Sequence, residues 1–107
     1  MHRVFVRVTA RRDLVGHYVY LAENAGLEIA DRFMANVEES FTDLARQPNM
    51  GSPVALRAPD LAGMRKWQIK EFKKYLIFYL PRPDGVSIVR VLHSAQDWWD
   101  LLGVETS

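Results

Sequence analysis

The chain opens with a short run rich in β-branched and aromatic residues and continues with hydrophobic residues at helical spacing. Residues 4–8 read Val-Phe-Val-Arg-Val, which is typical of a β-strand. Thr9 can then cap a helix that begins at Ala10. The hydrophobic positions of this helix recur every three or four residues, at Leu14, Tyr18, Leu21 and Ala25.

A second amphipathic segment follows directly. Gly26 interrupts the first helical pattern and predicts a turn between two helices. The next hydrophobic stripe consists of Ile29, Ala30, Phe33, Val37, Phe41, Leu44 and Ala45. Most acidic residues of the segment lie off that stripe, at Glu28, Asp31, Glu38, Glu39 and Asp43. We therefore expect a helix hairpin whose apolar side covers another layer of the protein.

The second half of the chain predicts a long loop and three strands. Residues 47–63 hold three prolines and two glycines, which is typical of a loop. The strands are predicted at residues 64–69, 75–80 and 86–93, and the second is apolar on both faces, as in the centre of a sheet. Polar turns are predicted at residues 71–74 and 81–85, of which the latter ends in Asp-Gly.

The C-terminal residues predict a short helix. Ser94 can cap it, with Asp97 three residues on. Its hydrophobic residues, which would dock it on the core, are Trp98, Leu101 and Leu102. Residues 104–107 are expected to fray. Residues 1–107 thus predict one α+β domain of order β-α-α-β-β-β-α, with the helix hairpin packed on a twisted, mainly antiparallel sheet.

Length and composition agree with one small domain and exclude several classes of protein. The chain has 107 residues, of which 49% are hydrophobic and none is cysteine. A disulfide scaffold, a thiolate zinc site and a cysteine nucleophile are therefore excluded. The first twelve residues lack the apolar stretch of a signal peptide, and no run approaches the ~18 apolar residues of a membrane span. We expect no metal, because His2, His17 and His93 are scattered, and no cofactor.

The net charge of +1 hides a strong segregation of charge along the chain. Residues 1–12 carry four arginines and no acid, and residues 23–43 carry six acids against Arg32 alone. Residues 57–82 carry seven basic residues against two acidic ones. This basic central segment suggests an anionic partner, either nucleic acid or an acidic protein surface; the alternative is a solvated strand-and-loop region.

Several short runs match the pattern of one protein family. In the second half these are Met64-Arg65, Tyr75-Leu-Ile-Phe-Tyr79 and Arg90-Val-Leu-His-Ser-Ala-Gln-Asp97. In the first half they are Asp13-Leu14, Tyr18, Phe33 and the helix end Leu44…Pro48…Gly51. Through these residues the chain resembles the RelE/ParE superfamily of bacterial toxins from type II toxin–antitoxin systems, and most closely the ParE-like branch. Gln96 departs from the pattern, because an arginine is usual there.

The resemblance implies a partner and a choice of targets. It implies a cytoplasmic hetero-oligomer with a cognate antitoxin, whose C-terminal segment wraps the toxin and through which alone operator DNA is contacted, with no membrane involved. ParE-like toxins are similar to poisons of DNA gyrase and need no catalytic residues. RelE-like toxins cleave messenger RNA on the ribosome, so an enzyme stays an alternative. The Gln96 departure leaves a third reading, a non-toxic co-repressor that only binds its antitoxin and DNA.

If the chain cleaves RNA, its side chains must supply a base, an acid and cations. The candidates are His93, Arg65 and Arg90. His93 alternates with Val89 and Val91, however, so the other interpretation is a core or capping histidine beside Ser94. Tyr75 and Tyr79 are expected to pack in the sheet rather than to act in catalysis.

A set of basic and aromatic residues is predicted to contact the target or the antitoxin. Lys70, Lys73 and Lys74 fall in a predicted tight turn, as a cationic knob or as a solubilising turn. Arg65 and Arg90 lie inside strands, where an arginine is costly unless paired, so each has a specific role or a structural partner in Asp97 or Glu71. Trp67 is expected in the core. Adjacent Trp98 and Trp99 cannot both face inward, which makes Trp99 a candidate anchor for a partner.

Overall fold

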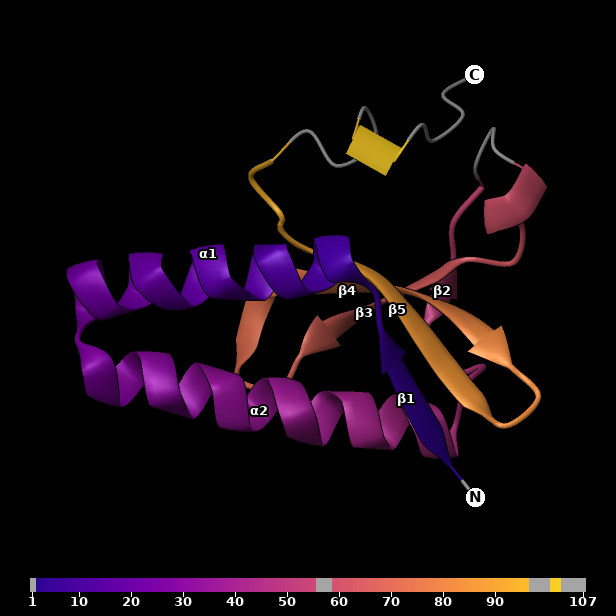
Figure 1. Cartoon of the computed structure of the whole chain (residues 1–107), viewed down its shortest axis with the longest axis horizontal. Helices are drawn as coiled ribbons and strands as arrows, with labels where there is room; N and C mark the ends of the chain where they lie inside the picture. Colours follow the sequence, from indigo (N-terminus) through magenta and orange to yellow (C-terminus); the bar gives the residue numbers. More distant parts are fainter. Residues whose placement is uncertain (1, 56–58, 97–100, 103–107) are drawn as a thin grey trace.

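The computed structural model describes residues 2–55, 59–96 and 101–102 and shows two helices packed on one face of a five-stranded sheet (Figure 1). The helices are α1 (Val8–Ala25) and α2 (Leu27–Arg46). The remaining elements are β1 (Arg3–Val6), β2 (Ser52–Pro53), the 3₁₀ helix η1 (Pro59–Leu61), β3 (Arg65–Ile69), β4 (Phe72–Arg82) and β5 (Gly85–His93).

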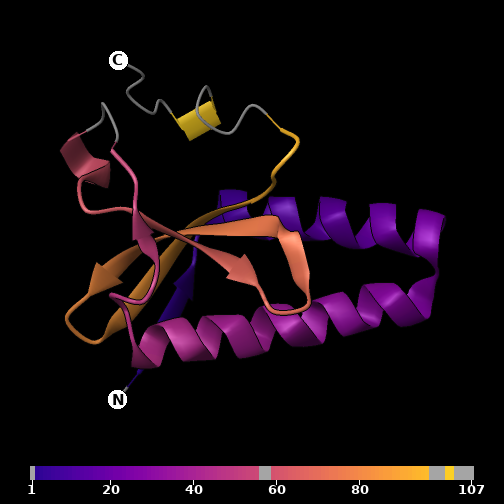
Figure 2. The same cartoon turned by 180° about the vertical axis from the view of Figure 1, so that it is seen from behind.

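The sheet has the strand order β1-β5-β4-β3-β2 and is antiparallel except at one edge. β3, β4 and β5 form the predicted antiparallel meander, seen from behind in Figure 2. β1 pairs in parallel with β5, and the long connection that a parallel pair requires contains the helix hairpin and the other three strands. The predicted α+β fold, with a helix hairpin on a mainly antiparallel sheet, is confirmed.

Hydrophobic side chains fill both faces of the sheet. The larger cluster lies between the helices and the sheet and includes Phe33, Leu44, Ile77 and Tyr79. A smaller cluster contains Met64, Phe78, Leu80, Val89, Leu92 and Leu102. β4 contributes to both clusters, as its two apolar faces predicted. Leu102 docks on the core as expected, whereas Leu101 is 50% exposed and does not.

The first helix begins earlier than the sequence suggested. The predicted strand over residues 4–8 stops at Val6, and α1 starts at Val8 rather than Ala10. The residue before the helix is Arg7, whose side chain makes no capping hydrogen bond, so the predicted cap at Thr9 is wrong. The reason lies in the sheet, because β1 ends where the Arg7 N–H donates to the Ile88 carbonyl.

The hairpin between β3 and β4 is tighter than predicted. The turn consists of Lys70 and Glu71, and Lys73 and Lys74 belong to β4 rather than to the turn. The backbone of Glu71 has a φ of 65°, a value that residues other than glycine rarely adopt. The buried Asn36 amide of α2 donates to the Glu71 carboxylate at 3.0 Å and so holds this conformation.

Two further predictions concern irregular segments. The predicted loop over residues 47–63 contains β2 and η1, so part of it is regular structure. Of the predicted C-terminal helix, residues 94–96 form a turn and a bend instead, since the Ser94 N–H donates to the Lys74 carbonyl of β4. The start of the rest of that helix, with Asp97, Trp98 and Trp99, lies outside the described residues.

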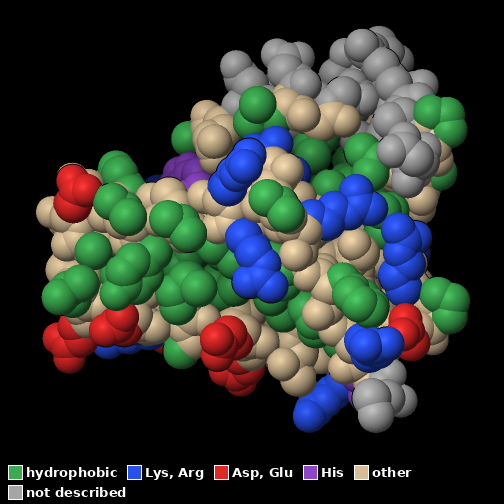
Figure 3. Space-filling view, in the orientation of Figure 1, with side chains coloured by type: hydrophobic (Ala, Val, Ile, Leu, Met, Phe, Trp, Pro, Cys, Tyr) green, Lys and Arg blue, Asp and Glu red, His purple; other side chains and the backbone are tan. Residues whose placement is uncertain are grey.

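The outer surface of the helix hairpin is partly hydrophobic. In Figure 3, hydrophobic side chains gather over α1 and toward α2, with acidic side chains near the α1–α2 turn and basic ones toward the sheet. The exposed large hydrophobic residues of the hairpin are Val8, Val15, Val19, Tyr20 and Leu27.

Candidate functional site

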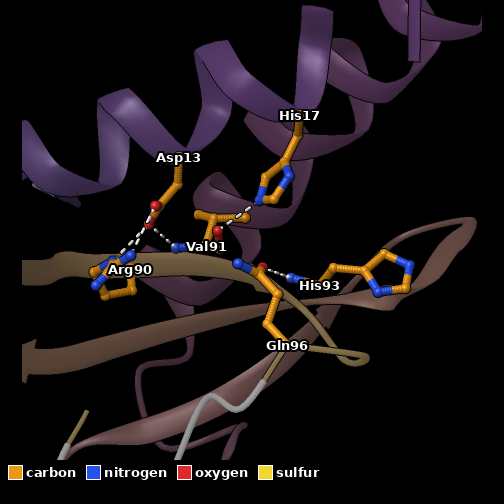
Figure 4. A network of polar contacts seen from close by, with 6 residues as sticks. All are labelled: Asp13, His17, Arg90, Val91, His93 and Gln96. Carbon is orange, nitrogen blue, oxygen red and sulfur yellow. Dashed lines mark hydrogen bonds and ion pairs between the residues drawn. The ribbon is translucent and has the colours of Figure 1, made fainter. Parts of the chain in front are cut away.

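Arg90 is held by an acidic residue of α1. Its Nε and Nη2 donate to the two carboxylate oxygens of Asp13 at 2.8 and 3.0 Å (Figure 4). This two-point geometry suits the planar guanidinium, and it raises the pKa of Arg90. The side chains are only 21% and 12% exposed. The partner of Arg90 is Asp13 rather than the predicted Glu71, and the other predicted partner, Asp97, lies outside the described residues.

Asp13 and His17 together complete the edge of β5 where β1 has ended. The Asp13 carboxylate accepts the Val91 N–H at 3.0 Å, and His17 Nε2 lies 2.7 Å from the Val91 carbonyl oxygen, to which it donates (Figure 4). The two residues are one helical turn apart and so project from the same side of α1. Their side chains thus satisfy the Val91 backbone groups that a neighbouring strand would otherwise bind.

The surroundings of His17 favour its neutral form. Burial lowers its pKa, and this outweighs the hydrogen bond to Val91 and the Asp13 charge, which act in the opposite direction. The rings of Tyr75 and Phe33 contact it edge-on at centroid distances of 4.9 and 6.3 Å. No prediction from the sequence named His17 as part of a site. The signal was its spacing four residues after Asp13 on a helix.

Arg65 and Tyr79 fasten the segment after α2 to the sheet. Arg65 Nη1 donates to the carbonyls of Gly51 and Asn49. The Tyr79 hydroxyl donates to the Pro48 carbonyl at 2.7 Å and accepts the Gly51 N–H at 2.9 Å. A Cβ at Gly51 would lie 2.6 Å from the Tyr79 hydroxyl, so only glycine fits here. Tyr79 packs in the sheet as predicted, and Arg65 contacts backbone carbonyls rather than the predicted Glu71.

His93 ends β5 on the side away from the Arg90 pair. Its Nδ1 accepts the Ala95 N–H at 3.0 Å, and its ring lies edge-on to Tyr75 at 4.9 Å. Figure 4 shows this ring pointing away from Asp13 and Arg90. The His93 N–H donates to the Gln96 side-chain oxygen at 2.7 Å. An arginine at this position, usual in the resemblance, has no acceptor for that bond.

The predicted catalytic residues do not come together. On β4, Arg65 pairs with Tyr79 and His93 pairs with Tyr75. Four residues along a strand span about 13 Å and two strand spacings about 10 Å, so the Arg65 and His93 backbones lie on the order of 16 Å apart. Arg90 forms an ion pair with Asp13.

All three residues of the predicted lysine group are exposed, and within the described residues only Lys70 forms an ion pair. Lys70 Nζ pairs with Glu39 of α2 at 2.7 Å, and its backbone N–H donates to Ser40 Oγ. Lys73 and Lys74 are exposed and form no ion pair within the described residues. Since the turn is tied to α2 by several bonds, the hairpin presents these two lysines on a fixed support.

Two hollows border this hairpin. A cleft of about 730 Å³ lies between α2 and β3 and is lined by residues that include Asp43, Arg46, Met50, Trp67 and Lys73. A smaller one of about 410 Å³ is lined by Glu71, Phe72, Lys73, Lys74, Tyr75 and His93. Trp67 packs against the helix-side core, as expected. Trp99 lies outside the described residues.

A metal site and a membrane-spanning helix are both absent from the described residues. No cluster of three or more His, Asp or Glu side chains in residues 2–55, 59–96 and 101–102 is placed to hold a metal ion. In the same ranges, no helix combines the length and apolar composition needed to cross a membrane.

Comparisons with known proteins assign the family. The chain matches the chromosomal ParDE TA system from P. aeruginosa with a TM-score of 0.69 and 18% identity, covering 87% of this chain and 96% of that one. It matches the YoeB-YefM complex from Staphylococcus aureus with a TM-score of 0.52 and 13% identity, covering 87% and 97%. No curated protein sequence matches. The sequence model of the ParE toxin of type II toxin-antitoxin system, parDE, matches residues 4–98, so the chain belongs to this toxin family.

Proposed function

We propose that this chain is a toxin that poisons DNA gyrase by protein–protein contact and is neutralised by a cognate antitoxin. The observation that carries the proposal is the separation of the three residues suited to RNA cleavage. A general base, an acid and a cation must lie within hydrogen-bond reach of one phosphate. Here Arg90 is bound to Asp13, Arg65 holds the turn after α2, and His93 is left without either arginine.

Inhibition by contact needs a firm surface rather than a catalytic group. Lys73 and Lys74 supply exposed positive charge on the β3–β4 hairpin, and the bonds from Asn36, Glu39 and Ser40 of α2 hold its turn in place. Because both lysines are free to meet an anionic surface, we assign them the contact with the target. The other predicted contacts, Arg65, Lys70 and Arg90, are occupied within the fold.

The antitoxin is proposed to bury apolar surface and to pair with basic residues. The cleft of about 730 Å³ beside β3 offers both, since Met50 and Trp67 lie in it with Arg46 and Lys73. A segment that folds on this surface fits the coupled folding that gives tight toxin complexes. Co-expression with the protein encoded beside this chain should restore growth and yield a purified complex, and Arg46→Glu should weaken that complex.

The gyrase proposal is tested by a supercoiling reaction with the purified chain, read on an agarose gel with and without ATP. Loss of supercoiling with accumulation of linear, protein-linked DNA is expected. Full supercoiling at concentrations that arrest growth would contradict the proposal.

Ribosome-dependent cleavage of messenger RNA is the second candidate. The observation in its favour is the hollow of about 410 Å³, where half-buried His93 lies with Lys73 and Lys74. These residues offer a titratable group beside two cations. Primer extension on messenger RNA during growth arrest separates the two candidates. Transcripts that are cleaved by wild type but stay intact with His93→Ala would support the ribonuclease. Intact transcripts during growth arrest by wild type would exclude it.

A further inference from the structure

The outer face of α1 carries hydrophobic side chains that the described residues leave exposed. α2 has an ordinary surface, with its buried stripe on one side and charged residues on the other. α1 buries one side against the core, yet Val8, Val15 and Val19 on its other side are 64%, 64% and 46% exposed. Hydrophobic area on two sides of one helix indicates a second contact beyond the core.

Charged residues interrupt and end this hydrophobic stripe in a regular order. Val8, Arg12, Val15, Val19 and Glu23 follow one another at steps of three or four residues, so they form one line along the helix. All five are exposed. Within the described residues neither Arg12 nor Glu23 forms an ion pair, so both charges are available to a partner. Figure 3 shows the same arrangement, with basic side chains toward the sheet and acidic ones toward the turn.

The charges on this face of α1 are complementary to those of a second α1 helix that runs antiparallel to it. Arg12 and Glu23 lie equally far from the point between residues 17 and 18, about 8 Å each at 1.5 Å per residue. In an antiparallel pair of α1 helices with a two-fold axis at that point, Arg12 of each copy lies opposite Glu23 of the other. Val15 and Val19 of both copies then lie between the two ion pairs. A two-fold interface requires such a self-complementary surface.

Gly16 supports close approach at the same place. It is exposed on the outer side of α1, and a Cβ built there would meet no atom within 4 Å. Glycine weakens a helix interior, and nothing inside the chain requires it at this position. In the reversed pair Gly16 lies opposite Val19 of the other copy, where a bare backbone lets the valine pack closely.

We propose that two copies of this chain associate through the outer faces of their α1 helices, antiparallel about a two-fold axis and joined by Arg12–Glu23 ion pairs. A single helix pair buries an area at the low end of stable interfaces, which begin at about 1,200 Å². We therefore expect a dimer that forms at concentrations on the order of micromolar. The surface lies apart from the cleft assigned to the antitoxin, and the dimer does not depend on the proposed target.

Sedimentation equilibrium on the purified chain tests the proposal through a charge exchange. Wild type is expected to dimerise. Arg12→Glu and Glu23→Arg are each expected to be monomeric, because every facing pair then carries like charges. An equal mixture of the two variants is expected to dimerise again, because each Arg12→Glu copy meets a Glu23→Arg copy with both pairs restored. Arg82→Glu, at the far end of β4, is the charge control and should behave as wild type.

Three results would overturn the proposal. The first is a wild-type chain that stays monomeric up to about hundredfold above the expected micromolar range. The second is a mixture of the two variants that stays monomeric. The third is a pair of variants that dimerise as wild type does while losing antitoxin binding, which would assign this face to the antitoxin.

A second variant keeps the test independent of folding. Gly16→Arg places a large side chain at the centre of the interface but favours the helix, because arginine is a better helix former than glycine. The expected result is loss of the dimer with an unchanged or higher melting temperature. A dimer that persists in Gly16→Arg would contradict close approach at this position.

Discussion

Basic residues that were predicted to serve one surface are used in two different ways. Arg65 of β3 and Arg90 of β5 hold segments of the chain together, one through backbone carbonyls and the other through Asp13. Lys73 and Lys74 lie at the start of β4, and their side chains form no ion pair within the described residues. The guanidinium offers several directed donors and suits a partly buried position, whereas the compact ammonium stays hydrated.

The difference explains why charge along the sequence was an incomplete guide to the site. The basic segment suggested one cationic surface, but a cation among apolar neighbours must be paired to be tolerated. Substitutions of the arginines should therefore change the stability of the fold. Substitutions of the lysines should change only what the surface binds.

The largest change in stability is expected for Arg90→Ala. It leaves the Asp13 carboxylate, which is 12% exposed, without its partner, and should lower the free energy of unfolding by about 2–4 kcal/mol. Urea unfolding measures this. Arg82→Ala, an exposed arginine at the end of β4, should change it by less than about 0.5 kcal/mol. Equal effects of the two variants would show that the Asp13 pair does not stabilise the fold.

A smaller loss is expected for Arg65→Ala, about 1–2 kcal/mol, because it removes the hydrogen bonds to the Gly51 and Asn49 carbonyls. Tyr79→Phe removes two bonds to the same turn and should cost a similar amount. Since both residues hold one segment, the double variant should lose less than the two single losses together. A double-mutant cycle in urea that is strictly additive would contradict a shared function.

A still smaller effect concerns pH and His17. The pKa of His17 in the folded chain lies below 6.5. As pH falls through this range, the unfolded chain therefore binds a proton at His17 more readily than the folded chain does. His17 therefore stabilises fully above about pH 6.5 and less as pH falls, by at most about 1.4 kcal/mol per pH unit. Between pH 7.5 and 5.5, wild type should lose more stability than His17→Gln, whose amide can still donate to Val91. Equal losses would contradict a lowered pKa for His17 in the folded chain.

The smallest change in stability is expected for Lys73→Gln/Lys74→Gln, within about 0.5 kcal/mol of wild type. Its effect should appear in growth arrest, which we expect to weaken because the proposed contact loses two charges. Arg82→Glu changes the net charge by the same amount at another place and should leave growth arrest intact. Equal growth arrest by the two variants would remove the lysines from the proposed contact.

Much of the fold was predictable because its signals are local. The helix stripes, the turn at Gly26 and the doubly apolar β4 are all visible in short windows of sequence. The ends of elements were less predictable, since they depend on distant partners. α1 starts directly after β1 ends, next to the Arg7–Ile88 backbone hydrogen bond, and the Asn36 side chain holds Glu71 in the turn after β3.

The site was predictable as a set of residue types but not as an arrangement. Arg65 and Arg90 were correctly expected to need partners, yet Asp13 lies 77 residues from Arg90 and no spacing rule joins them. Likewise, the His17–Val91 bond exists only because the helix hairpin returns the chain to β5. Contacts of this kind follow from the packing and not from the local pattern.

The most direct test of the account is the gyrase supercoiling reaction with purified wild type and His93→Ala side by side. If the chain acts by surface contact, both proteins should abolish supercoiling and leave linear, protein-linked DNA, because the described contacts of the His93 side chain, with the Ala95 N–H and the Tyr75 ring, are structural. The account would be contradicted if wild type left gyrase fully active and His93→Ala lost the ability to arrest growth.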